Sequence, residues 1–148
     1  MLELVAIGID GSLAKPIGVL PEHARDVLAG TVQMYRAAGF ELPWVGYIAI
    51  EDGVCVGTCA FKSVPRDGSV EIAYYTFPEH EGRGVATGMA RALIDIAAHA
   101  DRGLIVTAQT LPQENASTTI LRKLGFTHVG SVEHPEDGTV WEWQRLDR

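Results

Sequence analysis

The chain has 148 residues, and its 12 Lys and Arg against 19 Asp and Glu give a formal net charge of −7 at pH 7. This length suits one domain, residues 1–148, which can bury enough surface to fold without a disulfide or a metal. The acidic balance, without a basic cluster, argues against a nucleic-acid partner. The short, interrupted apolar runs argue against a membrane span, and the expected localisation is cytoplasmic.

Cys55 and Cys59 fall four residues apart in one expected strand. At about 3.3 Å per residue they lie roughly 13 Å apart, which is too far for a disulfide. We therefore expect two free, buried thiols, as is typical of a cytoplasmic protein. The five histidines show no metal-ligand spacing, so we expect no metal site.

The first half of the chain predicts a strand, a helix and an antiparallel meander of three strands. Residues 1–10 have the apolar character of a strand. Pro21 suits the first turn of a helix that extends to about Ala38, where Gly39 is a typical stop. The strands of the meander are expected at 44–50, 54–63 and 69–77, with turns at 51–53 and 65–68.

The second half predicts helices that alternate with strands. Val85, Met89 and Leu93 recur at helical spacing, which predicts an amphipathic helix. The remaining elements are expected to follow it. The expected ranges are helix 84–100, strand 103–110, helix 115–124, and a hairpin of 127–133 and 139–145. This order predicts an α/β (α+β) fold, a mixed and mostly antiparallel sheet of about seven strands with helices on both faces.

The most informative segment is the turn between the strand 69–77 and the helix 84–100. Gly82 and Gly84 allow a tight turn and a close approach of the backbone to a ligand. The helix N-terminus adds unpaired N–H groups and a partial positive charge, and Arg83 is the one fixed cation of the loop. The turn therefore predicts a phosphate site, with an ordinary connecting loop as the alternative. A dinucleotide fingerprint fits badly, because it requires glycine where Thr87 stands.

Two motifs in this chain resemble those of the GNAT acyltransferases. The turn is similar to their acetyl-CoA-binding motif, Gln/Arg-x-x-Gly-x-Gly/Ala, and reads Glu81-Gly82-Arg83-Gly84-Val85-Ala86. Further along, Asn-Ala-Ser at 115–117 and Leu-Arg-Lys-Leu-Gly-Phe at 121–126 resemble the subgroup that includes ribosomal-protein alanine N-acetyltransferases. The order of elements matches the GNAT fold over essentially the whole chain.

The resemblance implies direct transfer of an acetyl group from acetyl-CoA to a primary amine, either a protein N-terminus or a small-molecule amine. It also implies a sheet that is splayed at its centre, by a bulge in the strand that ends at Phe77, so that pantetheine can enter. The alternative is a non-catalytic acyl-CoA-binding module with the same fold. The expected cofactor-binding residues are Tyr75, Thr76, Phe77, Gly82, Arg83, Gly84, Val85, Ala86, Thr87, Asn115 and Ser117.

One residue of the first motif departs from the family pattern, because Glu81 stands where the family has Gln or Arg. If this position contributes only its backbone N–H, the side chain can point away from the pyrophosphate. If the carboxylate faced the phosphates, like-charge repulsion would weaken binding.

Two residues are the candidates for catalysis by analogy with the family. Glu71 matches the position of a catalytic glutamate in the related histone acetyltransferases and is the candidate base; a solvated carboxylate and a water base are the alternatives. Many members protonate the thiolate with a tyrosine, but Leu121 stands at that position. The subgroup resemblance points instead to Ser117, while Asn115 can cap the helix as well as contact pantetheine.

The acceptor has no readable signature in the sequence. Trp141 and Trp143 alternate on one face of the last strand, which is typical of a core, a homodimer interface or a substrate wall. Trp44 and Tyr47 can equally border an acceptor pocket or pack in the core. The surplus of carboxylates favours a cationic amine.

Overall fold

The computed structural model describes residues 2–18 and 20–146. Its order of elements agrees with the predicted order, with most boundaries within about two residues of those expected. The elements are β1 (Leu2–Ala6), α1 (Glu22–Ala38), β2 (Gly46–Glu51), β3 (Val54–Phe61), β4 (Ser69–Thr76), η1 (Pro78–His80), α2 (Val85–Ala100), β5 (Ile105–Thr110), α3 (Ala116–Lys123), β6 (Thr127–His134) and β7 (Gly138–Leu146).

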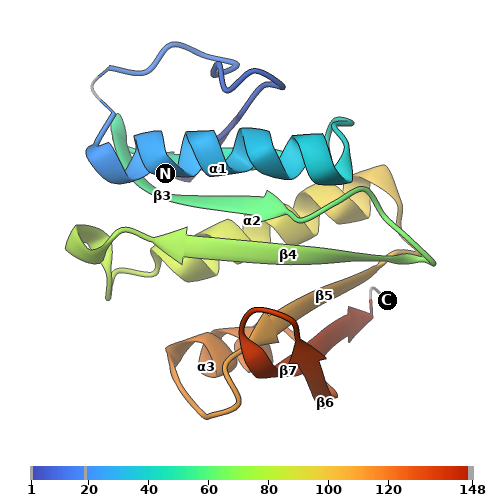
Figure 1. Ribbon diagram of the computed structural model, residues 1–148. Coiled ribbons are helices and arrows are strands. Elements are labelled where there is room, and N and C mark those ends of the chain that lie inside the picture. The colour runs from blue at the N-terminus through green and yellow to red at the C-terminus, as the bar shows by residue number, and fades with distance from the viewer. Residues whose placement is uncertain (1, 19, 147–148) are drawn as a thin grey trace.

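The seven strands form one sheet in the order β1-β2-β3-β4-β5-β7-β6. Every neighbouring pair is antiparallel except β4 and β5, which are parallel. Helix α1 lies across one face of the sheet and α2 lies behind the other (Figure 1). The mixed, mostly antiparallel sheet with helices on both faces confirms the predicted fold class.

The predicted splay is present at the centre of the sheet. Strands β4 and β5 pair only from Ser69–Ile105 to Glu71–Thr107 and then diverge, as Figure 1 shows. The prediction of a bulge in β4 is wrong, because β4 pairs with β3 in unbroken register from Ile72 to Thr76. The sheet therefore opens on one side of β4 only, while β3 holds the other side straight.

The core settles the role of most of the aromatic residues. Trp143 is fully buried, and its indole N–H donates to Thr110 Oγ1 over 3.0 Å. Trp44 and Tyr47 are buried as well, so both are core residues rather than the border of an acceptor pocket. Trp141 is partly buried and packs against the ring of His128. A homodimer therefore stays a prediction, with only Trp141 of the tryptophan pair left partly exposed.

Both cysteines are free and buried in β3, as predicted. Burial raises the pKa of both thiols, and that of Cys59 to about 12. Because the thiolate is the reactive form, neither cysteine should react with Ellman's reagent in the folded protein at pH 8. Both should react after unfolding in guanidinium chloride. Rapid modification of the folded protein would contradict the buried assignment.

Two findings concern the kinds of site the chain offers. No helix in the described residues has the length and apolarity needed to cross a membrane. Within residues 2–18 and 20–146, no three His, Cys, Asp or Glu side chains gather into a group that could hold a metal ion.

Candidate active site

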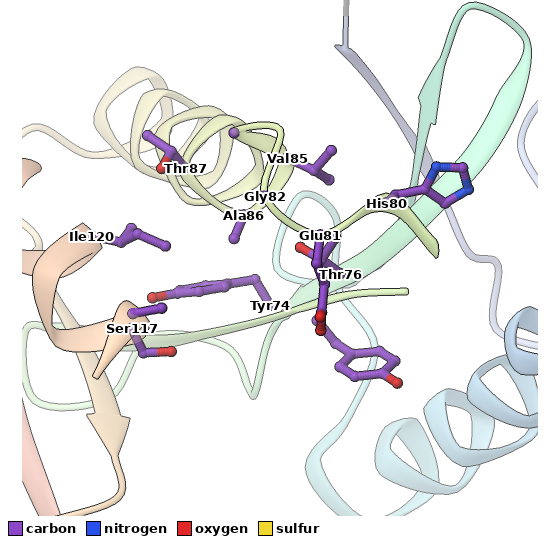
Figure 2. Close-up of a pocket in the computed structure, with 13 residues that line it drawn as sticks. Tyr74, Thr76, His80, Glu81, Gly82, Val85, Ala86, Thr87, Ser117 and Ile120 are labelled. Carbon is purple, nitrogen blue, oxygen red and sulfur yellow. The ribbon is translucent and has the colours of Figure 1, made fainter. Parts of the chain in front are cut away.

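A cleft of about 480 Å³ lies beside the splay, between the end of β4, the glycine turn with the start of α2, and the start of α3 (Figure 2). Residues 74–87, which are continuous in the chain, thus meet the start of α3, which lies further along the sequence. Among the predicted cofactor-binding residues, those that line the cleft are Tyr75, Thr76, Gly82, Gly84, Val85, Ala86, Thr87 and Ser117. Phe77, Arg83 and Asn115 are not among the lining residues.

The glycine turn presents bare backbone to the cleft. Gly82 and Gly84 have φ values of 76° and 81°, which lie in the left-handed region that favours glycine. A Cβ built at either position would meet no atom within 4 Å, so the space beside both glycines is open. The glycines are thus needed for the backbone conformation, and they leave room for a ligand to approach.

The N-terminus of α2 is uncapped. Gly84 is its N-cap residue and has no side chain to accept a hydrogen bond, and the first turn carries no acidic residue. The N–H groups of Val85, Ala86 and Thr87 point out of the helix end without an acceptor within the helix, whereas Gly88 N–H donates to Gly84 O over 3.0 Å. These donors and the helix dipole suit an anion such as a phosphate. The residues present therefore fit a phosphate-bearing cofactor.

The charged side chains of the turn do not place a fixed cation in the cleft, where it could contact a phosphate. Arg83 is exposed, with its guanidinium 2.9 Å from His80 Nδ1 and 3.9 Å from Glu51 Oε1. Glu81 lines the cleft, and its backbone N–H donates to Pro78 O over 3.4 Å. That N–H is already used, so backbone donation from position 81 does not explain the departure from the family motif.

Every second residue of β4 points its backbone N–H and C=O groups toward the splay. In an antiparallel strand the N–H and C=O of one residue point to one side, and those of the next residue point to the other. Glu71 O accepts from Lys62 N–H and Phe77 N–H donates to Val56 O, so the odd-numbered residues use their backbone on the β3 side. Tyr74 and Thr76 therefore turn their backbone groups toward the opening. Thr76 also holds a buried hydroxyl with no hydrogen-bond partner in the described residues.

Helix α3 begins with a reciprocal cap. Thr118 N–H donates to Asn115 Oδ1 over 3.1 Å, and Asn115 N–H donates to Thr118 Oγ1 over 3.0 Å. This arrangement ties Asn115 to the helix and leaves Ser117 on the cleft side (Figure 2). Asn115 thus serves as a cap, as one of its two predicted roles requires.

Removing this cap should cost stability. Asn115→Ala should lower the free energy of unfolding by about 1 kcal/mol, because the first turn of α3 loses its acceptor. Urea unfolding measures the change, and Asn115→Asp, which keeps the acceptor, is the matched control. An unchanged stability, combined with weaker binding of acetyl-CoA, would instead assign Asn115 to the cofactor.

Tyr74 is a cleft residue that the sequence did not indicate as part of the site. Its ring extends from β4 toward α3, and its hydroxyl lies beside Ser117 in Figure 2. Burial raises the pKa of Tyr74, and the neighbouring Ser117 side chain partly offsets this effect. Leu121, at the position of the family tyrosine, is fully buried. Strand alternation is the signal that could have found Tyr74, because it shares a side of β4 with Thr76.

Glu71 lies outside the main cleft, in an adjoining cavity of about 120 Å³. This second cavity shares Tyr74 and Ser117 with the main cleft. Lys62 Nζ lies 3.1 Å from Glu71 Oε2, an ion-pair distance without the angles of a hydrogen bond. The candidate base is thus one cavity away from the glycine turn, and Tyr74 and Ser117 stand between the two.

The splayed sheet and the uncapped helix N-terminus beside it suit a phosphate-bearing ligand that enters the gap between two parallel strands. The model of the acetyltransferase (GNAT) domain family matches residues 19–127, more than half of the sequence, and the chain belongs to this family. Membership of this family supports acetyl-CoA as the cosubstrate, which the turn motif predicted. A search of the curated proteins gave no match.

Solved structures confirm the fold at low sequence identity. A chimera of the spermidine N-acetyltransferase SpeG from Vibrio cholerae and hSSAT has a TM-score of 0.70 and 14% identity, over 99% of this chain and 95% of that one. The ribosomal-protein-S5-alanine acetyltransferase from Vibrio fischeri has a TM-score of 0.65 and 16% identity, over 90% and 78%.

The aminoglycoside acetyltransferase AAC(6')-Ib in complex with coenzyme A has a TM-score of 0.59 and 22% identity, over 69% of this chain and 65% of that one. This chain thus spans less than two thirds of the length of that structure. At these identities the likeness establishes the shared fold.

Proposed function

We propose that residues 1–148 form one N-acetyltransferase domain, which transfers the acetyl group of acetyl-CoA directly to a primary amine of a small molecule or a protein N-terminus. The observation that carries the proposal is the meeting of the uncapped α2 N-terminus with the Tyr74–Ser117 pair in one cleft. Similar structures bear the names of acetyltransferases for spermidine, for the alanine of a ribosomal protein and for aminoglycosides, which supports an amine acceptor.

The binding roles follow from the free backbone groups. The N–H groups of Val85, Ala86 and Thr87, with the bare glycines before them, would hold the pyrophosphate. The backbone of Tyr74 and Thr76 would pair with the amides of pantetheine, as an added strand does. The Thr76 hydroxyl, which lacks a partner, would gain one from the same ligand.

The catalytic roles are assigned to the side chains of Tyr74 and Ser117 in the cleft and to the carboxylate of Glu71 in the adjoining cavity. Acetyl-CoA supplies an activated acyl group. Glu71 would accept a proton from the amine. The Tyr74–Ser117 pair would donate a hydrogen bond, and then a proton, to the departing sulfur; the raised pKa of Tyr74 keeps its hydroxyl protonated at neutral pH.

The second candidate is a non-catalytic acyl-CoA-binding module, and the presence of Glu81 on the cleft wall favours it. Calorimetric titration with acetyl-CoA, followed by a thiol-release assay over a broad panel of amines, separates the two. We expect binding together with amine-dependent release of CoA. Binding without release would favour the module, and a lack of binding would overturn both. We further propose a cytoplasmic location, which two free, buried thiols support.

A further inference from the structure

The second cavity carries both signs of charge in a small space. Lys62 follows β3, Glu71 lies on β4 and Gln109 on β5, so three neighbouring strands contribute to it. Ser117 and Tyr74 close the cavity toward the main cleft. One lysine and one glutamate leave the lining without net charge, in contrast with the −7 of the whole chain.

The polar groups of this cavity are incompletely paired. Glu71 Oε2 is buried and accepts no hydrogen bond among the described residues, although Lys62 Nζ lies 3.1 Å away. Gln109 Nε2 donates to Glu142 Oε2 over 3.3 Å, which leaves its carbonyl oxygen as the group available to a ligand. The Glu71 carboxylate thus has an opposite charge beside it but no hydrogen bond to this oxygen, and a ligand that brings an ammonium N–H into the space can supply one.

We propose that the acceptor is a small zwitterion, an α-amino acid, whose ammonium group lies against Glu71 and whose carboxylate lies against Lys62. The inference rests on the proposed function and names its substrate class. In an α-amino acid the two charges sit on adjacent carbon atoms, so one molecule can engage a lysine and a glutamate that are only 3.1 Å apart. Tyr74 and Ser117 line the same cavity as Glu71, so the ammonium would lie close to the pair proposed to act on the thioester.

The other acceptor classes fit this lining less well. A polyamine or an aminoglycoside carries several positive charges, and Lys62 would repel them at the site itself. A peptide N-terminus carries an ammonium but no adjacent carboxylate, so Lys62 would gain nothing from it. The surplus of acidic residues in the whole chain therefore does not decide the acceptor, because the local lining is balanced.

A neighbouring cavity provides room for the side chain of the amino acid. It measures about 150 Å³, lies between α1 and the β3–β4 pair, and shares Ala73 and Tyr74 with the zwitterion cavity. Val27 and the buried Cys59 contribute apolar surface, and no charged residue lines it. This lining favours an aliphatic side chain.

The groups that line the cleft and the zwitterion cavity account for every proton in the transfer. The ammonium gives one proton to Glu71, its nitrogen forms a bond to the acetyl carbon, and the carbon–sulfur bond breaks. The sulfur leaves with the electron pair of that bond and takes a proton from the Tyr74–Ser117 pair. The new amide nitrogen releases its second proton, which restores the donor. The products are the N-acetylated amino acid, free CoA and the one proton held by Glu71.

The test compares free amino acids with their carboxamides, for example alanine and leucine with alaninamide and leucinamide. CoA release is measured in the full chain with saturating acetyl-CoA. We expect kcat/KM to fall by about tenfold or more for each amide, because the charge-assisted contact with Lys62 is lost. Lys62→Met should lower kcat/KM for the free acids and bring acids and amides to similar values. Lys15→Met, which removes an exposed lysine paired with Glu3, is the matched control.

Each outcome decides the inference. Discrimination by the wild type that Lys62→Met abolishes and Lys15→Met preserves supports it. Faster release with amides, spermidine or an alanine-terminated peptide than with free acids overturns the zwitterion and leaves the N-acetyltransferase intact. No release with any of these amines, although acetyl-CoA binds, overturns the proposed function together with it. Thermal unfolding of Lys62→Met shows whether the variant is folded, and Lys62→Arg, which keeps the charge, should retain the preference for acids.

Discussion

Gly84→Val is expected to weaken the binding of acetyl-CoA by about 100-fold or more, because two effects act at the same place. Gly84 has a φ of 81°, a conformation that a β-branched residue adopts only with strain. It is also the N-cap of α2, and the space beside it is open toward the cleft. Valine would shift the turn and place methyl groups where the pyrophosphate is expected. Calorimetric titration with acetyl-CoA measures the loss.

The matched control is Gly138→Val. Gly138 has a φ of 73° and equally open surroundings, but it lies at the start of β7, outside the cleft. Both variants should lose similar stability to backbone strain, whereas only Gly84→Val should lose affinity. Normal affinity in Gly84→Val would refute the phosphate site at the turn. Equal losses of affinity in both variants would attribute the effect to a general loss of structure.

Tyr74→Phe is expected to lower kcat by about 100-fold, while the affinity for acetyl-CoA changes little. The hydroxyl is the part of the residue that is removed, and the ring that forms the cleft wall remains. A tyrosine hydroxyl is protonated at neutral pH, and burial raises the pKa of Tyr74 further, so the hydroxyl can donate to a developing thiolate. A stopped-flow assay of CoA release measures kcat, and calorimetric titration measures the affinity for acetyl-CoA.

Ser117→Ala should also lower kcat, and the double variant distinguishes a pair from two separate groups. If Ser117 and Tyr74 act as one donor, the double variant should be about as slow as the slower single variant. Tyr47→Phe is the control, because it removes a hydroxyl that donates to Pro43 O over 2.7 Å in the core, away from the cleft. An unchanged kcat in Tyr74→Phe would remove the tyrosine from the mechanism and leave Ser117 as the only proposed donor.

Local chemistry is what made the glycine turn and the α3 cap predictable. Gly82 and Gly84 need a left-handed backbone whatever the rest of the protein does, and Asn115 followed by Thr118 caps a helix with groups three residues apart. The β-rich runs separated by turns at 51–53 and 65–68 likewise predicted the meander. The bulge in β4 was predicted wrongly because it was inferred from the family, whereas pairing with β3 keeps the strand regular.

The order of elements and the glycine turn were determined by the sequence alone, because each depends on residues that are neighbours along the chain. The spacing of the two cysteines likewise argued against a disulfide between them, and the short apolar runs argued against a membrane span. The partnership of Tyr74 with Ser117, and the cavity that joins Lys62 to Glu71, were decided only by the tertiary structure. The first contact joins β4 to α3 across the place where β4 and β5 diverge, and the second joins residues 62 and 71, which face each other across the β3–β4 pair. No pattern within one segment encodes the first contact, since it depends on how far two parallel strands separate after only three paired residues.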